Sequence, residues 1–125
     1  MLNNKKLNVE IIVADYYKKI TTPMLKSSTD ILKKNKINYS VSYVAGAYEI
    51  PQLISYKIKK NQINLFIAFG CIIKGETYHF EVLSNSIAKS LLDLCIHNKK
   101  TFVTNGILNV NKMSQAVTRS SNKRN

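Results

Sequence analysis

Residues 65–73 have the sequence LFIAFGCII, which is the longest apolar run in the chain. The run suits a β-strand and is too short for a membrane helix, which needs about 18 or more apolar residues. A strand that is apolar on both faces belongs in the middle of a parallel sheet that helices cover on both sides. The run therefore predicts a central, buried strand in an α/β protein.

Strand and helix patterns alternate outward from this run. Before it, Thr22 and Pro23 predict a helix start, with Thr as N-cap and Pro at the first helical position, and this helix ends near Asn35. A second helix begins at Pro51, and a third begins at Phe80 after a polar loop over residues 74–79. The remaining expected elements are strands over residues 7–14, 39–44 and 101–108, and a helix over residues 111–119.

The strict βαβαβαβα order predicts an α/β fold, a three-layer α/β/α sandwich with a four-stranded parallel sheet and a flavodoxin-like arrangement. A chain of 125 residues fits a single domain, residues 1–125, and no linker or repeat divides it. The two cysteines, Cys71 and Cys95, lie far apart in an order that suits neither a disulfide framework nor a metal site. Both are expected to be buried free thiols.

The formal net charge of +12 raises the question of a polyanionic partner. Lysine supplies 17 of the 19 basic residues, spread mostly over expected helix ends and loops, whereas sequence-specific nucleic-acid binding relies on arginine and interleaved aromatic residues. We therefore expect no nucleic-acid or membrane partner, and keep a basic nucleic-acid-binding module as the least favoured alternative. The first six residues have no signal-peptide pattern, which indicates a cytoplasmic location.

Polar residues follow each expected strand, at the edge where open parallel sheets bind ligands. These segments are residues 15–17, residues 46–51, residues 74–79, and Asn105-Gly106 at the end of the fourth strand. The third segment is the richest, because Gly75-Glu76-Thr77 leads into a helix start that suits an anion such as phosphate. His79 at the same place is a candidate proton carrier, whereas His97 lies at a helix C-terminus, where the helix dipole explains it.

Two other classes with this fold do not match the segments. A response-regulator receiver needs an acidic pair after the first strand and an Asp after the third, but the chain has Asp15 alone and then Cys71-Ile72-Ile73-Lys74. A flavodoxin needs a hydroxyl-rich phosphate loop after the first strand, which residues 15–19 do not supply. The dinucleotide fingerprint G-x-G-x-x-G is also absent from the sequence.

Three stretches resemble the lumazine synthase family. Residues 46–51, GAYEIP, are similar to its G-[AS]-[FY]-E-[IL]-P motif, and residues 70–80, GCIIKGETYHF, to its G-x-[VI]-[IV]-[RK]-G-E-T-x-H-[FY] motif. Residues 105–108, followed by Gln115-Ala116 and Arg119, resemble the last strand and the helix after it. The resemblance covers about residues 7–123, and its middle motif is long and correctly placed.

The resemblance implies a reaction and a set of roles. It is the condensation of 5-amino-6-ribitylaminouracil with 3,4-dihydroxy-2-butanone 4-phosphate, without metal or organic cofactor, and with His79 moving protons. The implied uracil and ribityl contacts are Tyr16, Ala47, Tyr48, Glu49, Cys71, Ile72, Ile73 and, more weakly, Asn105. The implied phosphate contacts are Glu76, Thr77 and Arg119.

The resemblance also implies a homo-oligomer, a pentamer or a multiple of it, in which Asn105 and Arg119 reach the site of a neighbouring subunit. Riboflavin synthase is a candidate partner. One departure is that relatives continue past Asn-Lys-Gly into a further helix, whereas this sequence ends at Asn125. We expect the final packing helix to be missing, in either a fragment or a naturally short chain, and the role of Lys123 stays open. A catalytically impaired shell or ribityl-binding subunit is the alternative function.

Overall fold

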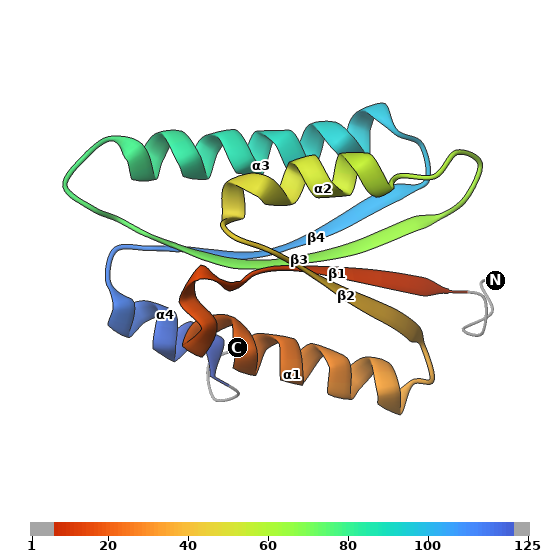
Figure 1. Cartoon of the computed structure of the whole chain (residues 1–125), viewed down its shortest axis with the longest axis horizontal. Helices are drawn as coiled ribbons and strands as arrows, with labels where there is room; N and C mark the ends of the chain where they lie inside the picture. The colour runs from red at the N-terminus through yellow and green to blue at the C-terminus, as the bar shows by residue number, and fades with distance from the viewer. Residues whose placement is uncertain (1–6, 122–125) are drawn as a thin grey trace.

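The computed structural model describes residues 7–121, in which four strands alternate with four helices (Figure 1). The strands are β1 (Asn8–Ala14), β2 (Asn38–Val44), β3 (Asn64–Ile73) and β4 (Thr101–Val110). The helices are α1 (Lys18–Lys34), α2 (Ile50–Lys57), α3 (His79–His97) and α4 (Met113–Ser120). Two short 3-10 turns, Asp15–Tyr17 and Ala47–Glu49, lead into α1 and α2.

All strand pairs are parallel, and the order across the sheet is β2-β1-β3-β4. Helices α2 and α3 cover one face of the sheet, and α1 and α4 cover the other (Figure 1). The predicted three-layer α/β/α sandwich with a four-stranded parallel sheet is confirmed.

The apolar run of residues 65–73 lies in β3, as its composition predicts. β3 pairs with β1 on one side, and along its whole length with β4 on the other, from Asn64 opposite Thr101 to Ile73 opposite Val110. The second central strand, β1, is covered on both faces, and Ile11 and Ile12 are fully buried. A strand needs apolar side chains on both faces only in such an environment.

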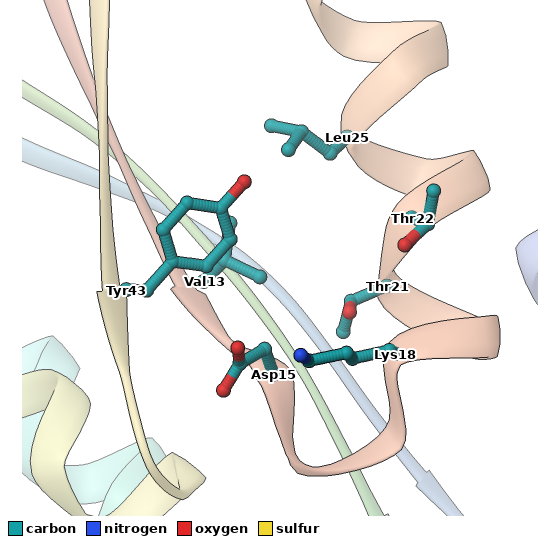
Figure 2. A pocket seen from close by; sticks show the side chains of 7 residues that line it. All are labelled: Val13, Asp15, Lys18, Thr21, Thr22, Leu25 and Tyr43. Atoms are coloured by element: carbon teal, nitrogen blue, oxygen red, sulfur yellow. The ribbon is translucent and has the colours of Figure 1, made fainter.

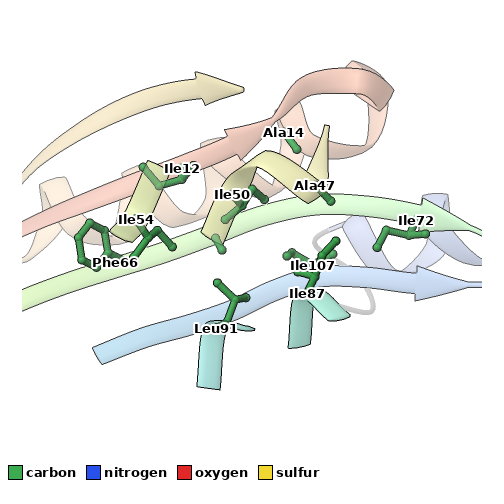
Figure 3. Packing of buried hydrophobic residues seen from close by; sticks show 11 residues of the cluster. Ile12, Ala14, Ala47, Ile50, Ile54, Phe66, Ile72, Ile87, Leu91 and Ile107 are labelled. Carbon is green, nitrogen blue, oxygen red and sulfur yellow. The ribbon is translucent and has the colours of Figure 1, made fainter. Parts of the chain in front are cut away.

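The larger core cluster lies between the sheet and the α2–α3 layer (Figure 3). Ile12 from β1, Ile54 from α2 and Leu91 from α3 pack there with at most 3% of their surface exposed. Burying each such side chain contributes about 1.5–3 kcal/mol through the hydrophobic effect. Three residues of this cluster, Ala14, Ala47 and Ile72, lie near the carboxyl edge of the sheet.

The start of α1 differs from the prediction. The helix begins at Lys18, directly after the 3-10 turn, and Pro23 lies inside it rather than at its first position. Ile20 and Thr21 are both buried, so the inward face of the helix begins before the proline. Burial of this first turn outweighs the backbone hydrogen bond that the missing N–H of Pro23 removes.

Two further expectations are corrected. β4 continues to Val110, so Asn105 and Gly106 lie in the middle of the strand, opposite Ala68 and Phe69, and not at its end. The strand is longer because all ten residues of β3 offer it backbone partners. Both thiols are free, but only Cys71 is buried, because Cys95 lies on a half-exposed face of α3.

Candidate active site

The carboxyl edge of the sheet carries a pocket of about 410 Å³, within the usual size range of small-molecule sites. It is bounded by the turns after β1 and β2, the end of β3 and the start of α3. The lining residues are Tyr16, Tyr17, Gly46, Ala47, Tyr48, Glu49, Cys71, Ile72, Ile73, His79 and Leu83. Eight of the twelve residues predicted from the sequence therefore surround one cavity.

The turn between β1 and α1 places two aromatic rings at the pocket. The rings of Tyr16 and Tyr17 meet edge to face, with centroids 4.9 Å apart and an interplanar angle of 80°. Tyr16 is 76% exposed, whereas Tyr17 is half-buried. Burial raises the pKa of the Tyr17 phenol above its ordinary value, and the nearby Tyr16 and Cys71 add to the shift.

The turn after β2 is closed by Glu49. Its Oε2 accepts a hydrogen bond of 3.1 Å from the Gly46 N–H, and the Glu49 N–H donates to the Gly46 carbonyl, also at 3.1 Å. Among residues 7–121 no other hydrogen bond reaches this carboxylate. Glu49 therefore shapes the turn with one oxygen and offers the other to a ligand hydroxyl or N–H.

The end of β3 supplies the wall of the pocket. Cys71 and Ile72 are buried, and Ile73 is half-buried at the point where the strand leaves the sheet. Burial raises the pKa of the Cys71 thiol, so this side chain is neutral near pH 7. Gly70 lies just below, where a Cβ would sit 3.4 Å from that of Ala14 and 3.6 Å from that of Ala47. These are ordinary van der Waals distances, so the turn after β2 packs directly against this part of β3 without requiring a glycine there.

The loop between β3 and α3 leads the chain to His79, the first residue of α3. Thr77 Oγ1 accepts a hydrogen bond of 3.3 Å from the His79 N–H, the first N–H of the helix. In the described part of the chain, no hydrogen bond uses the backbone N–H groups of residues 75–77. These exposed donors at a helix N-terminus suit an anion, and the His79 imidazole borders both them and the pocket.

A salt bridge ties this loop to the helix. Lys74 Nζ lies 3.4 Å from Glu81 Oε1, and the Lys74 N–H donates to the Val110 carbonyl at 2.9 Å. Lys74, at the start of the loop, is therefore tied both to β4 and to the first turn of α3.

The other four predicted residues do not line the pocket. Glu76 and Thr77 lie in the exposed loop beside it. Asn105 is exposed in the middle of β4, and its Oδ1 accepts a hydrogen bond of 3.0 Å from the Ile107 N–H. Arg119 is exposed near the end of α4, in the helix layer on the far face of the sheet. Lys123, whose role the sequence leaves open, lies outside the described residues.

Three lining residues were not predicted from the sequence as site residues: Tyr17, Gly46 and Leu83. Gly46 and Tyr17 belong to the polar segments that follow β2 and β1, so their position was the available signal. Leu83 lies one turn into α3, on the half-buried face of the helix, where a core role is the ordinary expectation.

A second, smaller hollow of about 270 Å³ lies between α1 and the β1–β2 side of the sheet (Figure 2). Asp15 and Lys18 face each other across its mouth, and the Tyr43 ring stands opposite α1. The hydroxyl of the buried Thr21 donates to the carbonyl of Tyr17, the last residue of the 3-10 turn before α1. None of the residues predicted from the sequence lines this hollow.

The described residues contain no cluster of three His, Cys, Asp or Glu side chains that could hold a metal ion. None of their helices is long and apolar enough to cross a membrane. The pocket offers an exposed aromatic ring, a carboxylate, an imidazole and a helix start with unused donors. Fold and site together are those of an α/β/α sandwich protein with a small-molecule pocket at the carboxyl edge of its sheet.

The particular family follows from comparison with known proteins. The chain belongs to the 6,7-dimethyl-8-ribityllumazine synthase family, whose model matches residues 6–125. It is 40% identical to the synthase of Bartonella tribocorum over 114 residues. This alignment covers 90% of this chain and 74% of that protein. The resemblance predicted from the sequence motifs is confirmed.

Two more relatives give the same result. The synthase of Bartonella henselae is 40% identical over 114 residues, covering 90% of this chain and 73% of that protein. The synthase of Buchnera aphidicola subsp. Baizongia pistaciae is 35% identical over 122 residues, covering 94% and 76%. The chain thus spans about three quarters of the length of these relatives.

Proposed function

We propose that this chain catalyses the condensation of 5-amino-6-(ribitylamino)uracil with 3,4-dihydroxy-2-butanone 4-phosphate in riboflavin biosynthesis. The products are 6,7-dimethyl-8-ribityllumazine, phosphate and water, and the enzyme is a transferase that uses no metal or organic cofactor. The observation that carries the proposal is the single pocket formed by eight residues of the family motifs and the segment after β1. These residues lie on four separate segments, and only the fold brings them together.

The pyrimidine is assigned to the Tyr16 side of the pocket. The exposed Tyr16 ring offers an apolar face to a flat heterocycle. Backbone groups of residues 71–73 would bind the edge of the uracil ring. The ribityl hydroxyls would meet Ala47, Tyr48 and Glu49, whose carboxylate has an oxygen left to accept a hydrogen bond.

The phosphate is assigned to the loop before α3. The N–H groups of Glu76 and Thr77 are exposed at the positive end of the helix dipole, where an anion is stabilised. Arg119 would add a charge-assisted contact from a neighbouring subunit. The same contacts stabilise the phosphate as it leaves.

His79 is assigned the proton transfers. His79 lines the pocket next to the proposed phosphate loop. From there its imidazole would serve both the carbonyl that the amine attacks and the carbon that loses a proton as phosphate leaves. A large part of the acceleration would come from holding the two substrates side by side.

The assembly is assigned to a cytoplasmic homo-oligomer, a pentamer or a multiple of it, with riboflavin synthase as a candidate partner. Large apolar side chains are exposed on α3 and on the edge strand β4, namely Val82, Leu92, Ile96 and Phe102. Exposed apolar side chains on an edge strand and on the helix beside it are a feature of subunit interfaces. A neighbour packed on this side of the molecule would also meet Asn105, which lies on the same edge strand.

The test is a turnover assay that follows the absorbance of the lumazine product over the uncatalysed reaction. We expect clear acceleration by the wild type, and a fall of kcat by about 100-fold in His79→Gln, the lower end of what a positioned proton carrier contributes. The matched control is His97→Gln, because His97 is the other histidine and lies at the opposite end of α3.

A folded wild type that binds the lumazine product without any turnover would favour the binding-only subunit instead. Equal losses in both histidine variants would remove His79 from its assigned role.

A further inference from the structure

The two tyrosines that follow β1 are fixed to very different degrees. The Tyr16 ring is 76% exposed, so its contact with Tyr17 is the ring contact that orients it. The Tyr17 ring packs at the edge of a core cluster formed by Ile20 and Met24 of α1, Cys71 of β3 and Ala116 of α4. Tyr17 is thus anchored to three elements of the fold, and Tyr16 to Tyr17.

The backbone of Tyr17 is anchored as well. The Thr21 hydroxyl, 98% buried, donates a hydrogen bond of 3.4 Å to the Tyr17 carbonyl. The Thr21 side chain lies in the first turns of α1, next to that of Lys18 (Figure 2). The position of Tyr17 therefore follows the position of α1.

We infer that Tyr17 is a positioning residue for the pyrimidine site, because its ring holds the Tyr16 ring in the orientation that a flat substrate needs. The inference rests on the proposed function. An edge-to-face contact leaves at least one face of Tyr16 uncovered, and both rings border the same pocket. Without Tyr17, the exposed Tyr16 ring would sample several rotamers, and binding the substrate would have to restrict them.

The Tyr17 ring acts here through its shape rather than its hydroxyl. Burial raises the pKa of the phenol, so the group is neutral throughout the neutral pH range. Phenylalanine keeps the ring and its packing, whereas leucine and methionine fill similar space without an aromatic edge. Comparing the phenylalanine variant with the leucine and methionine variants therefore distinguishes an aromatic contact from simple filling of the core.

The experiment is a double-mutant cycle on steady-state kinetics with Tyr16→Ala, Tyr17→Leu and the double variant. Tyr17→Leu is expected to raise KM for the pyrimidine by about 3- to 10-fold, the range that one aromatic pair provides. Its kcat and its KM for the butanone phosphate should stay within about twofold of the wild type. Tyr17→Phe should restore most of the pyrimidine KM. In the Tyr16→Ala background, Tyr17→Leu should raise KM for the pyrimidine by less than about twofold.

Tyr56→Leu is the matched control, since Tyr56 is 87% exposed on α2 and does not line the pocket. Tyr17→Met is a second variant, and thermal unfolding is measured on every protein. An equal rise in KM in both Tyr16 backgrounds would overturn the inference, because Tyr17 would then act without Tyr16. Failure of both Tyr17→Leu and Tyr17→Met to fold, with Tyr17→Phe folded, would show a purely structural role and overturn it too.

The wild type separates this inference from the proposed function. If it turns over and the cycle shows no coupling, only the role of Tyr17 fails. If it lacks turnover but binds the lumazine product, fluorescence titration of that product supplies the same cycle. If it neither turns over nor binds the product, the proposed function fails, and the role of Tyr17 fails with it.

Discussion

At the scale of single residues, Gly106 marks the closest approach of β4 to β3. A Cβ at this position would lie 2.7 and 2.8 Å from two atoms of the Phe69 ring and 2.9 Å from the Ala68 carbonyl oxygen. Two of these contacts involve a ring held in the core, so relief requires the strands to shift. Glycine is required here by space, since its φ is not positive.

We therefore predict that Gly106→Ala destabilises the fold by about 1–3 kcal/mol, the usual cost of overpacking. Urea unfolding of the variant and the wild type would measure the difference. Gly75→Ala is the control, because its Cβ would meet nothing within 4 Å in an exposed loop. Equal stability of the Gly106 variant and the wild type would mean that β4 moves away from Phe69 freely.

The residues of the site were predictable from the sequence to different degrees. Polar and glycine positions after the first three strands located the carboxyl-edge pocket, because parallel strands bring their ends together. Tyr17 could not be assigned a role in this way, since the turn after β1 has no periodicity that shows which ring points into the core. Asn105 and Arg119 do not join the pocket of their own chain. That they reach the site of a neighbouring subunit, as the resemblance implies, stays a prediction.

At the scale of elements, the loop between β3 and α3 depends on the pair of Lys74 and Glu81. The 3.4 Å salt bridge joins the end of the strand to the first turn of the helix, and both side chains are partly exposed. Pairs of this kind contribute only about 0–1 kcal/mol to stability. We expect the salt bridge to matter for the geometry of the loop, because the N–H groups of the loop must stay in place to hold a phosphate.

We predict that Glu81→Gln raises KM for the butanone phosphate by about 2- to 5-fold, with a change in stability below about 1 kcal/mol. KM for the pyrimidine should hardly change, because Tyr16 and residues 71–73 are held by other contacts. Asp30→Asn is the control, since it breaks the Lys26–Asp30 pair, which is also exposed, on α1. Equal effects on both substrates would indicate a general disturbance of the site and contradict this role.

The elements themselves followed from the sequence wherever hydrophobic pattern and boundary residues agreed. The β3 run and the order of strands and helices were predicted correctly, because both depend on burial in a parallel sheet. The start of α1 was predicted too late, because Thr22-Pro23 has the local chemistry of a helix start. Packing of Ile20 and Thr21 on the sheet decided the boundary instead.

At the scale of the whole molecule, several of the lysines lie at helix ends away from the pocket. Lys33 and Lys34 lie in the last turn of α1, and Lys57 in the last turn of α2. Helices α1 and α2 end at the opposite edge of the sheet from the pocket (Figure 1). Cations at helix C-termini are stabilised by the helix dipole, so these lysines have a local explanation that does not involve a polyanionic partner.

The assignment of Arg119 to a neighbouring site leads to a prediction about mixed oligomers. His79 starts α3 and Arg119 lies near the end of α4, in layers on opposite faces of the sheet. If each active site takes His79 from one subunit and Arg119 from the next, His79→Gln and Arg119→Ala damage different halves of the same site. Each variant alone has only damaged sites, and loss of a charge-assisted phosphate contact costs Arg119→Ala about 10- to 100-fold in kcat/KM.

Refolding the two variants together in equal amounts should restore activity. Half of the subunits carry His79 and half of their neighbours carry Arg119, so about one site in four receives both residues in a closed ring of identical contacts. We therefore predict that the mixture reaches about a quarter of wild-type activity, well above the mean of the two variants refolded separately. Activity equal to that mean would place both residues in one chain's site, or Arg119 outside any site. Because complementation needs contact between subunits, it should also disappear on dilution to the concentration where the oligomer dissociates.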